Sequence, residues 1–204
     1  MTDYARTERR LLADLLAATG PDLPTVCEGW TTRDLAAHVV TRDRRPDAML
    51  GEYVKPLAAH GEKVRLTTAA RPFEDLVADV RTPPAWSLVS NTLTDELANG
   101  VEMFVHHEDV RRAQPGWEPR VLSHAHEAAL WKAVKLTSRL TLRHYHPIRV
   151  EAPGFGVCQL GDGHPRATLL GAPSELVLFI SGRQRIASVE VAGDESLRTA
   201  RFRV

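Results

Sequence analysis

Two histidines and one glutamate are the residues of this sequence best suited to chemistry. Glu102 and His106 stand four positions apart, so on a helix both side chains leave the same face, one turn apart. His38 lies in a distant segment and has to come from another helix. Two imidazoles and one carboxylate can hold a divalent metal and leave positions open for water or substrate. The sequence therefore indicates a candidate catalytic metal site.

The same residues also have simpler interpretations. A glutamate and a histidine four residues apart on a helix are most often a solvated ion pair. Val101 and Phe104 belong to an apolar arc of the helix, and Glu102 and His106 fall at the rim of that arc. This position suits a rim ion pair as well as a polar notch in a helical core. His38 stands beside alanines and valines, where a packed core histidine is the common case. Spacing alone leaves these alternatives open.

The elements that must position these residues are predicted to be helices. Thr31 and Asp34 form a capping box at the start of a helix that runs through His38 to about residue 41. A polar stretch over 60–71 is expected to be a loop, and Pro72 opens the next short helix.

Two longer helices follow in the sequence. The apolar periodicity predicts one over 88–113 and another over 123–143, after a first apolar stripe at 11–16. Helices joined by short connections are typical of an antiparallel bundle.

After residue 146 the pattern changes to short strands separated by Gly- and Pro-rich turns. The predicted strands cover 148–152, 156–160, 167–170 and 186–191. A helix is expected over 173–180, and Asp194 is expected to cap a last short helix. We therefore expect an α+β protein, with a helical bundle over 1–146 and a small α+β domain over 147–204.

Composition narrows the classes of function. Lys plus Arg and Asp plus Glu each total 26, so the net charge is zero and no basic field is available for nucleic acid or an anionic membrane. The first residues are polar, and no apolar run approaches the roughly 18 residues of a membrane span. Cys27 and Cys158 are too few for a disulfide framework. We expect a cytoplasmic monomer or homodimer that acts on a small molecule, without nucleic-acid or membrane partners.

Three segments of this sequence resemble the mycothiol-dependent maleylpyruvate isomerase family. They are Gly-Trp-Thr-x-x-Asp-Leu-x-x-His ending at His38, Glu-x-x-x-His-x-x-Asp from Glu102 to Asp109, and a looser apolar tail ending at Gly182-Arg183. The resemblance covers nearly the whole chain in the same order. It implies a DinB-like four-helix bundle as the N-terminal domain, followed by a small α+β domain.

The resemblance also implies roles for individual residues. His38, Glu102 and His106 are expected to bind a divalent metal, with zinc as the first choice and nickel or iron as alternatives. Mycothiol is the implied thiol cofactor. Arg183 is expected to bind a substrate carboxylate and so to take part in catalysis. Asp109, and with it Asp34, is expected to accept hydrogen bonds from the ligand histidines.

These expectations describe a metal-dependent enzyme that uses a low-molecular-weight thiol to isomerise or conjugate a small electrophile, which can carry a carboxylate. The enzyme is then an isomerase or a thiol S-transferase. A metal-binding protein without turnover and a small-molecule-binding module remain alternatives. The sequence departs from the family at Glu108, where members often carry tryptophan. Because Glu108 falls within the apolar arc, we expect it either to pair with a buried cation or histidine or to line an altered pocket.

Overall fold

The computed structural model describes residues 4–87 and 99–202. The chain divides into two compact units, and the first ends at Glu118. The first unit is helical and the second combines helices with a small sheet. The predicted α+β class, with a helical N-terminal part and an α+β C-terminal part, is confirmed.

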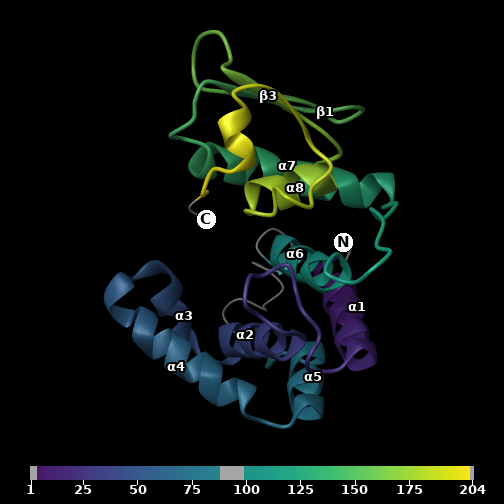
Figure 1. The fold of residues 1–204 in the computed structure, drawn as a ribbon, viewed down its shortest axis with the longest axis vertical. Helices are drawn as coiled ribbons and strands as arrows, with labels where there is room; N and C mark the ends of the chain where they lie inside the picture. The colour runs from purple at the N-terminus through teal and green to yellow at the C-terminus, as the bar shows by residue number, and fades with distance from the viewer. Residues whose placement is uncertain (1–3, 88–98, 203–204) are drawn as a thin grey trace. The chain divides into compact units, whose positions relative to one another are not determined.

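Four helices build the core of the first unit (Figure 1). They are α1 (Tyr4–Thr19), α2 (Thr32–Arg44), α5 (Phe73–Arg81) and α6 (Gly100–Arg111), and α1 packs against each of the other three. Their enclosed apolar side chains form one cluster. It contains Leu12, Ala13, Leu16, Leu35, Ala36, Ala37, Val39, Val40, Ala69, Phe73, Leu76, Val77, Val80, Met103 and Val110.

Helix α2 begins as the sequence predicts. The hydroxyl of Thr31 accepts from the backbone N–H of Asp34, and the carboxylate of Asp34 accepts from the backbone N–H of Thr31. This reciprocal box satisfies two amides that the helix itself cannot pair. It fixes the start of α2 one turn before His38.

Helices α3 (Pro46–Tyr53) and α4 (Ala58–Ala69) are joined by the 3₁₀ turn η1 (Lys55–Leu57), and both pack against α2. The expectation of a loop over 60–71 is therefore wrong, because α4 occupies most of it. The apolar residues of α4 do not recur at a helical period, so the sequence pattern did not indicate a helix there. Its buried polar residue Arg65 instead forms ion pairs within the unit.

The helix predicted over 88–113 is observed from Gly100 as α6 and ends at Arg111. Its expected first part, 88–98, lies outside the described residues.

The second unit is a four-stranded sheet with α7 and α8 on one of its faces (Figure 1). The strand order is β2-β1-β3-β4, with β1 antiparallel to β2 and parallel to β3, and β3 antiparallel to β4. The elements are α7 (His124–Thr141), β1 (Ile148–Ala152), β2 (Gly156–Leu160), β3 (Ala167–Leu170), α8 (Pro173–Ile180), β4 (Glu190–Gly193) and the 3₁₀ turn η3 (Glu195–Arg198).

The first three strands and α8 have the predicted bounds, but the fourth strand starts later than expected. The backbone N–H of Ile186 bonds to the carbonyl of Arg183 in a turn, and the N–H of Ser188 is taken by the carboxylate of Glu175. These amides therefore cannot join the sheet. Asp194 accepts from a backbone amide at the start of η3, as predicted.

Helix α7 was expected in the N-terminal bundle, with the domain boundary near residue 146. The structure groups α7 with the second unit, where it packs against α8 and β2. Glu127 of α7 accepts from both the backbone N–H and the hydroxyl of Ser174 at the start of α8. A helical period shows that a helix has an apolar face, but not which neighbour covers that face.

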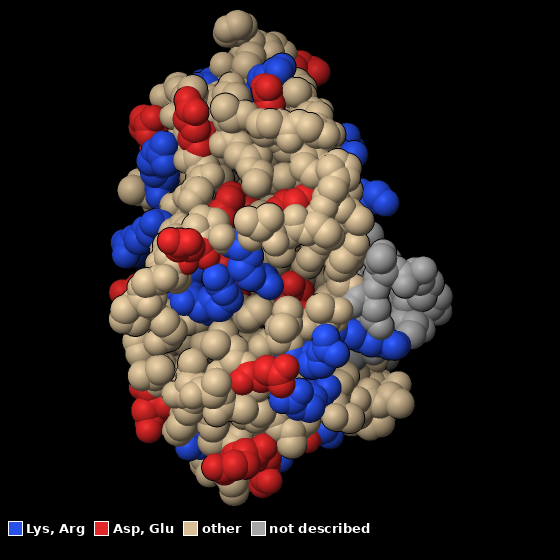
Figure 2. Space-filling view, turned by 90° about the vertical axis from the view of Figure 1, so that its right-hand side faces the viewer, with Lys and Arg blue, Asp and Glu red and all other residues tan. Residues whose placement is uncertain are grey.

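Acidic and basic side chains are intermixed on the face drawn in Figure 2. Within 4–87 and 99–202, no helix is both long and apolar enough to cross a membrane.

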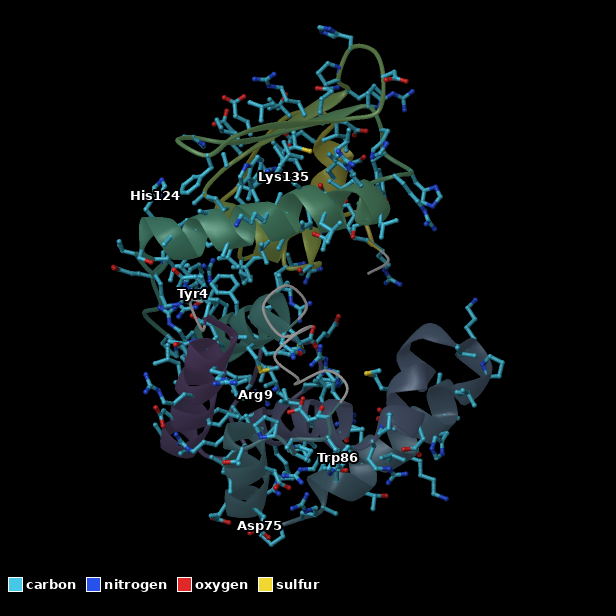
Figure 3. All side chains as sticks on the ribbon, turned by 180° about the vertical axis from the view of Figure 1, so that it is seen from behind. Tyr4, Arg9, Asp75, Trp86, His124 and Lys135 are labelled. Atoms are coloured by element: carbon cyan, nitrogen blue, oxygen red, sulfur yellow. The ribbon has the colours of Figure 1, made fainter. Side chains whose placement is uncertain are left out.

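Charged groups also lie inside the first unit. Arg9 on α1, labelled in Figure 3, donates to the carboxylate of Asp43 on α2 and to the carbonyl of Val80 on α5. Both charged side chains are almost fully buried. This ion pair joins three helices of the bundle around their apolar core.

Candidate metal centre

The structure brings His38, Glu102 and His106 together. His38 lies on α2, one turn after the capping box, and the other two lie one turn apart on α6. The side chains of Glu102, His38 and His106 are 32 %, 15 % and 8 % exposed, so the cluster reaches solvent at its glutamate. The exposure of the cluster is thus greatest at Glu102, while its histidines stay largely buried.

The ligand atoms of these residues fit a metal ion. The Nε2 atoms of His38 and His106 lie 3.5 Å and 3.2 Å from the same carboxylate oxygen of Glu102. One ligand atom from each residue can be chosen so that all lie within 4.8 Å of one another. A tetrahedral zinc with bonds of about 2.0–2.1 Å separates its ligands by roughly 3.3 Å. The spacing therefore suits zinc coordination with a position left for another ligand.

Asp109 orients the ring of His106. The Nδ1–H of His106 donates to Oδ2 of Asp109 at 2.9 Å, and Asp109 is fully buried. An ionised carboxylate can only accept, so this bond places a proton on Nδ1 and leaves Nε2 toward Glu102. A carboxylate behind a histidine ligand is a common support of metal sites. The expected role of Asp109 therefore has the required geometry.

Without a metal, Glu102 and His106 form an ion pair. Burial opposes ionisation of Glu102, but hydrogen bonds from His106 and His38 and the charge of Arg42 outweigh it and hold its pKa well below the usual range. Burial likewise opposes protonation of His106, but its hydrogen bonds to Asp109, Cys27 and Glu102 raise its pKa well above 6.5. The raised pKa favours protonated, positively charged His106. A bound metal cation would take the place of that proton.

Asp34 does not take the role expected of it. Its carboxylate accepts from Thr31 at the start of α2 and pairs with Arg65 at 2.7 Å, rather than with a histidine of the cluster. Burial opposes its ionisation, but the hydrogen bonds from Arg65 and Thr31 lower its pKa. The carboxylate of Asp34 faces Thr31 at the start of α2, and so it does not face the ring of His38 one turn later.

Cys27 adds a thiol close to the cluster. Its Sγ–H donates to Oδ2 of Asp109 at 3.3 Å, and the adjacent backbone N–H of Val26 bonds to the Asp109 carbonyl. Ligand-type atoms of Cys27, His106 and Asp109 also lie within 4.8 Å of one another. The same oxygen of Asp109 therefore accepts from both the thiol of Cys27 and the ring of His106.

Arg42 is a member of the site that the sequence analysis missed. Its Nε lies 3.6 Å from Oε1 of Glu102, and its Nη1 donates to the Asn99 side chain at 2.6 Å. The spacing in the sequence could have indicated this residue, because Arg42 follows His38 by four residues and so lies on the same face of α2. The site therefore includes a fixed positive charge beside its carboxylate.

Glu108 follows one of the two expectations stated for it. The side chain is 1 % exposed and forms an ion pair with Nε of Arg112, whose side chain is also 1 % exposed. Arg111 lies within 3.5 Å of the same carboxylate. Glu108 is therefore paired with a buried cation, as a carboxylate in an apolar arc requires.

Arg183 belongs to the second unit. It follows α8 and Gly182, which has a φ of 86° and so ends the helix in a conformation that favours glycine. Its Nη1 donates to the carbonyl of Ser181 at 2.6 Å. A role of Arg183 toward the metal cluster stays a proposal.

The fold and the site define a class of protein: a helical bundle that presents a His–Glu–His cluster, followed by a small α+β unit. Residues 4–87 match the mycothiol maleylpyruvate isomerase N-terminal domain family. This match supports the resemblance to the family that the sequence motifs indicate. The matched range contains His38 and ends before α6, which carries Glu102 and His106.

One solved structure extends the likeness to both units. It is described as the crystal structure of the mycothiol-dependent maleylpyruvate isomerase, and it aligns with a TM-score of 0.55 over 93 % of this chain and 90 % of that chain. The sequence identity is 12 %, so this likeness concerns the fold. No curated protein matches the chain.

Proposed function

We propose that this protein is a divalent-metal-dependent enzyme that uses a low-molecular-weight thiol, with mycothiol as first choice, to isomerise or conjugate a small electrophile. The observation that carries the proposal is the convergence of the His38 and His106 Nε2 atoms on one oxygen of Glu102. Two imidazoles and a carboxylate suit zinc, with nickel and iron as alternatives. The matched family and the similar structure both carry mycothiol in their descriptions, which supports a thiol cofactor.

The residues of the cluster have separate tasks in this proposal. His38, Glu102 and His106 hold the metal, and Asp109 keeps the His106 ring in the orientation that exposes Nε2. A bound dication favours the thiolate form of a thiol, which is the form that attacks an electrophilic carbon. Arg42 holds a positive charge 3.6 Å from Glu102, where it attracts an anionic reactant.

Arg183 is proposed to orient a carboxylate of the substrate. A planar guanidinium binds a carboxylate through parallel hydrogen bonds, which fixes the angle of approach as well as the position. Its half-buried position at the end of α8 limits the motion of its side chain. Replacement by lysine would keep the charge and lose the paired hydrogen bonds.

The first test is the metal content of the purified protein, measured by elemental analysis for the wild type beside His38→Ala. We expect about one zinc, nickel or iron per wild-type chain and almost none in the variant, because two remaining ligands bind weakly. His164→Ala is the matched control, since His164 is exposed and lies in the second unit. Absence of metal from the wild type after reconstitution with each ion would contradict the proposal.

Turnover separates an enzyme from a metal-binding protein. Metal-loaded protein is mixed with mycothiol and a panel of conjugated acids and other electrophiles, and the loss of free thiol and the formation of isomer are followed. Metal-dependent consumption of thiol identifies a transferase, and isomer formation with the thiol conserved identifies an isomerase. A metal-loaded protein inactive toward every electrophile would favour metal binding without turnover.

A further inference from the structure

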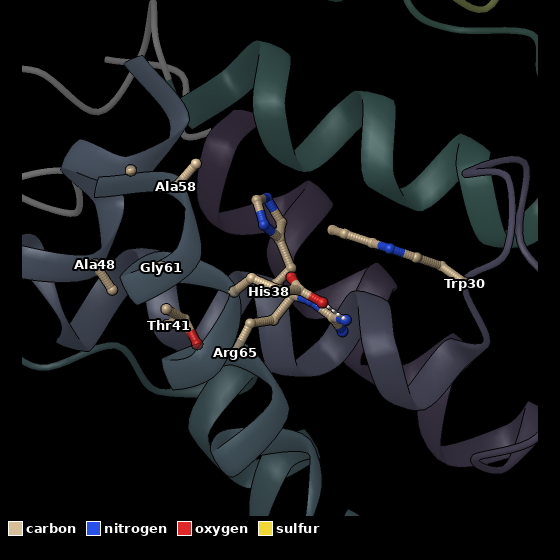
Figure 4. A pocket seen from close by; sticks show the side chains of 9 residues that line it. Trp30, His38, Thr41, Ala48, Ala58, Gly61 and Arg65 are labelled. Carbon is tan, nitrogen blue, oxygen red and sulfur yellow. Dashed lines mark hydrogen bonds and ion pairs between the residues drawn. The ribbon is translucent and has the colours of Figure 1, made fainter. Parts of the chain in front are cut away.

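A pocket of about 260 Å³ opens beside His38 in the first unit (Figure 4). Its walls come from α2, α3 and α4, together with Trp30 just before α2. His38 lines the pocket and also faces Glu102. A molecule in this pocket therefore lies against one of the candidate metal ligands.

Short residues on α3 and α4 leave the space open. Ala48, Gly51, Ala58 and Gly61 line it. The glycines are required by close packing, because a Cβ on Gly51 would lie 2.7 Å from the carbonyl oxygen of Leu57, and one on Gly61 would lie 2.8 Å from that of Ala48. Since these four positions carry no long side chains, the two helices approach closely without filling the pocket.

The charged groups of the pocket are already matched. Arg65 pairs with Asp34 and with Glu62, each at 2.7 Å, and its Nε donates to Glu62 as well. Its guanidinium also lies 4.8 Å from the ring centre of Trp30. One cation between two carboxylates leaves a net negative charge, so an anionic ligand gains little from Arg65 and is repelled by Glu62.

We propose that this pocket holds the uncharged, apolar end of the electrophile, up to the size of a fused bicyclic ring. The inference rests on the proposed function and specifies its substrate class. A dry apolar cavity of about 150 Å³ holds benzene, so the pocket has room for a second fused ring. The aromatic wall of Trp30 favours a planar group. A carboxylate on such a substrate belongs at its other end.

The test compares two probes of one shape, naphthalene-2-carboxamide and naphthalene-2-carboxylate, by isothermal titration calorimetry on the wild-type chain. Both are titrated into metal-free and zinc-loaded protein. We expect the uncharged amide to bind in both states, and the carboxylate to bind at least about tenfold more weakly to the metal-free protein. Equal or tighter binding of the carboxylate to the metal-free protein would overturn the inference.

A pair of variants localises the amide. Ala58→Phe places a ring in the pocket and is expected to weaken amide binding by about tenfold or more. Ala59→Phe adds the same ring at the next exposed position of α4, which does not line the pocket, and is expected to bind as the wild type does. Equal binding to the wild type and to Ala58→Phe would overturn the inference, and circular dichroism checks that both variants fold.

The outcomes also separate this inference from the proposed function. Amide binding to the metal-free wild type needs neither metal nor turnover, so it survives if no reaction is found. A metal- and thiol-dependent reaction that proceeds equally fast with a bicyclic electrophile in Ala58→Phe would leave the proposed function intact and overturn the assignment of the pocket.

Discussion

His106 donates its Nδ1–H to the buried carboxylate of Asp109 at 2.9 Å, across one turn of α6. The same ring directs Nε2 to Glu102 at 3.2 Å. The two bonds fix both the tautomer and the rotation of the ring. Their spacing of three and four residues on one helix makes α6 the element that sets the geometry of the cluster.

Asp109→Asn is expected to weaken zinc binding by about 10–100-fold, because an amide supports the ligand histidine less well than a carboxylate does. Competition with a chelating indicator dye measures the affinity. Asp162→Asn, an exposed change in the second unit, is the control and is expected to bind zinc as the wild type does. An unchanged affinity in Asp109→Asn would show that Asp109 does not support the ligand.

The metal-free protein is expected to lose stability as the pH rises above about 6.5, the ordinary pKa of histidine. Below that value His106 is protonated in the folded and unfolded states, and its ion pair stabilises the fold fully. Above it the unfolded chain releases the proton first, so the free energy of unfolding falls until the pH passes the raised pKa of folded His106. One proton limits the slope to about 1.4 kcal/mol per pH unit.

Urea unfolding of chelator-treated protein at about pH 6, 7 and 8 measures this slope. His106→Gln removes the titrating ring and is expected to flatten it. Zinc is expected to reverse the trend, because metal binding requires a neutral imidazole and releases protons. A wild-type slope equal to that of His106→Gln would contradict the assignment.

Glu108→Ala is expected to destabilise the protein by about 3–5 kcal/mol, because it leaves the buried guanidinium of Arg112 without this carboxylate. Asp14→Ala removes the partner of Arg81 from a largely exposed pair in the same unit and is expected to cost at most about 1 kcal/mol. Urea unfolding followed by circular dichroism gives both values. Equal losses would show that burial of the Glu108 pair has no special cost.

The sequence by itself determined the features that depend on neighbours along the chain. The capping box of Thr31 and Asp34, the one-turn spacing of Glu102 and His106, and the alternation of the strand at 148–152 are local patterns. Each reports a hydrogen bond or an apolar face that forms within one element. The bounds of the first three strands and the start of α2 were therefore predicted correctly.

Only the tertiary structure decided which faces meet. In the structure His38 lies beside Glu102, and Asp34 forms an ion pair with Arg65. A helix covers most of the polar stretch at 60–71, and α7 belongs to the second unit. These outcomes depend on the free energy of packing between segments that are far apart in the sequence. Local periodicity carries no information about that free energy. For the same reason the pocket beside His38, made by three helices and Trp30, has no signature in the sequence.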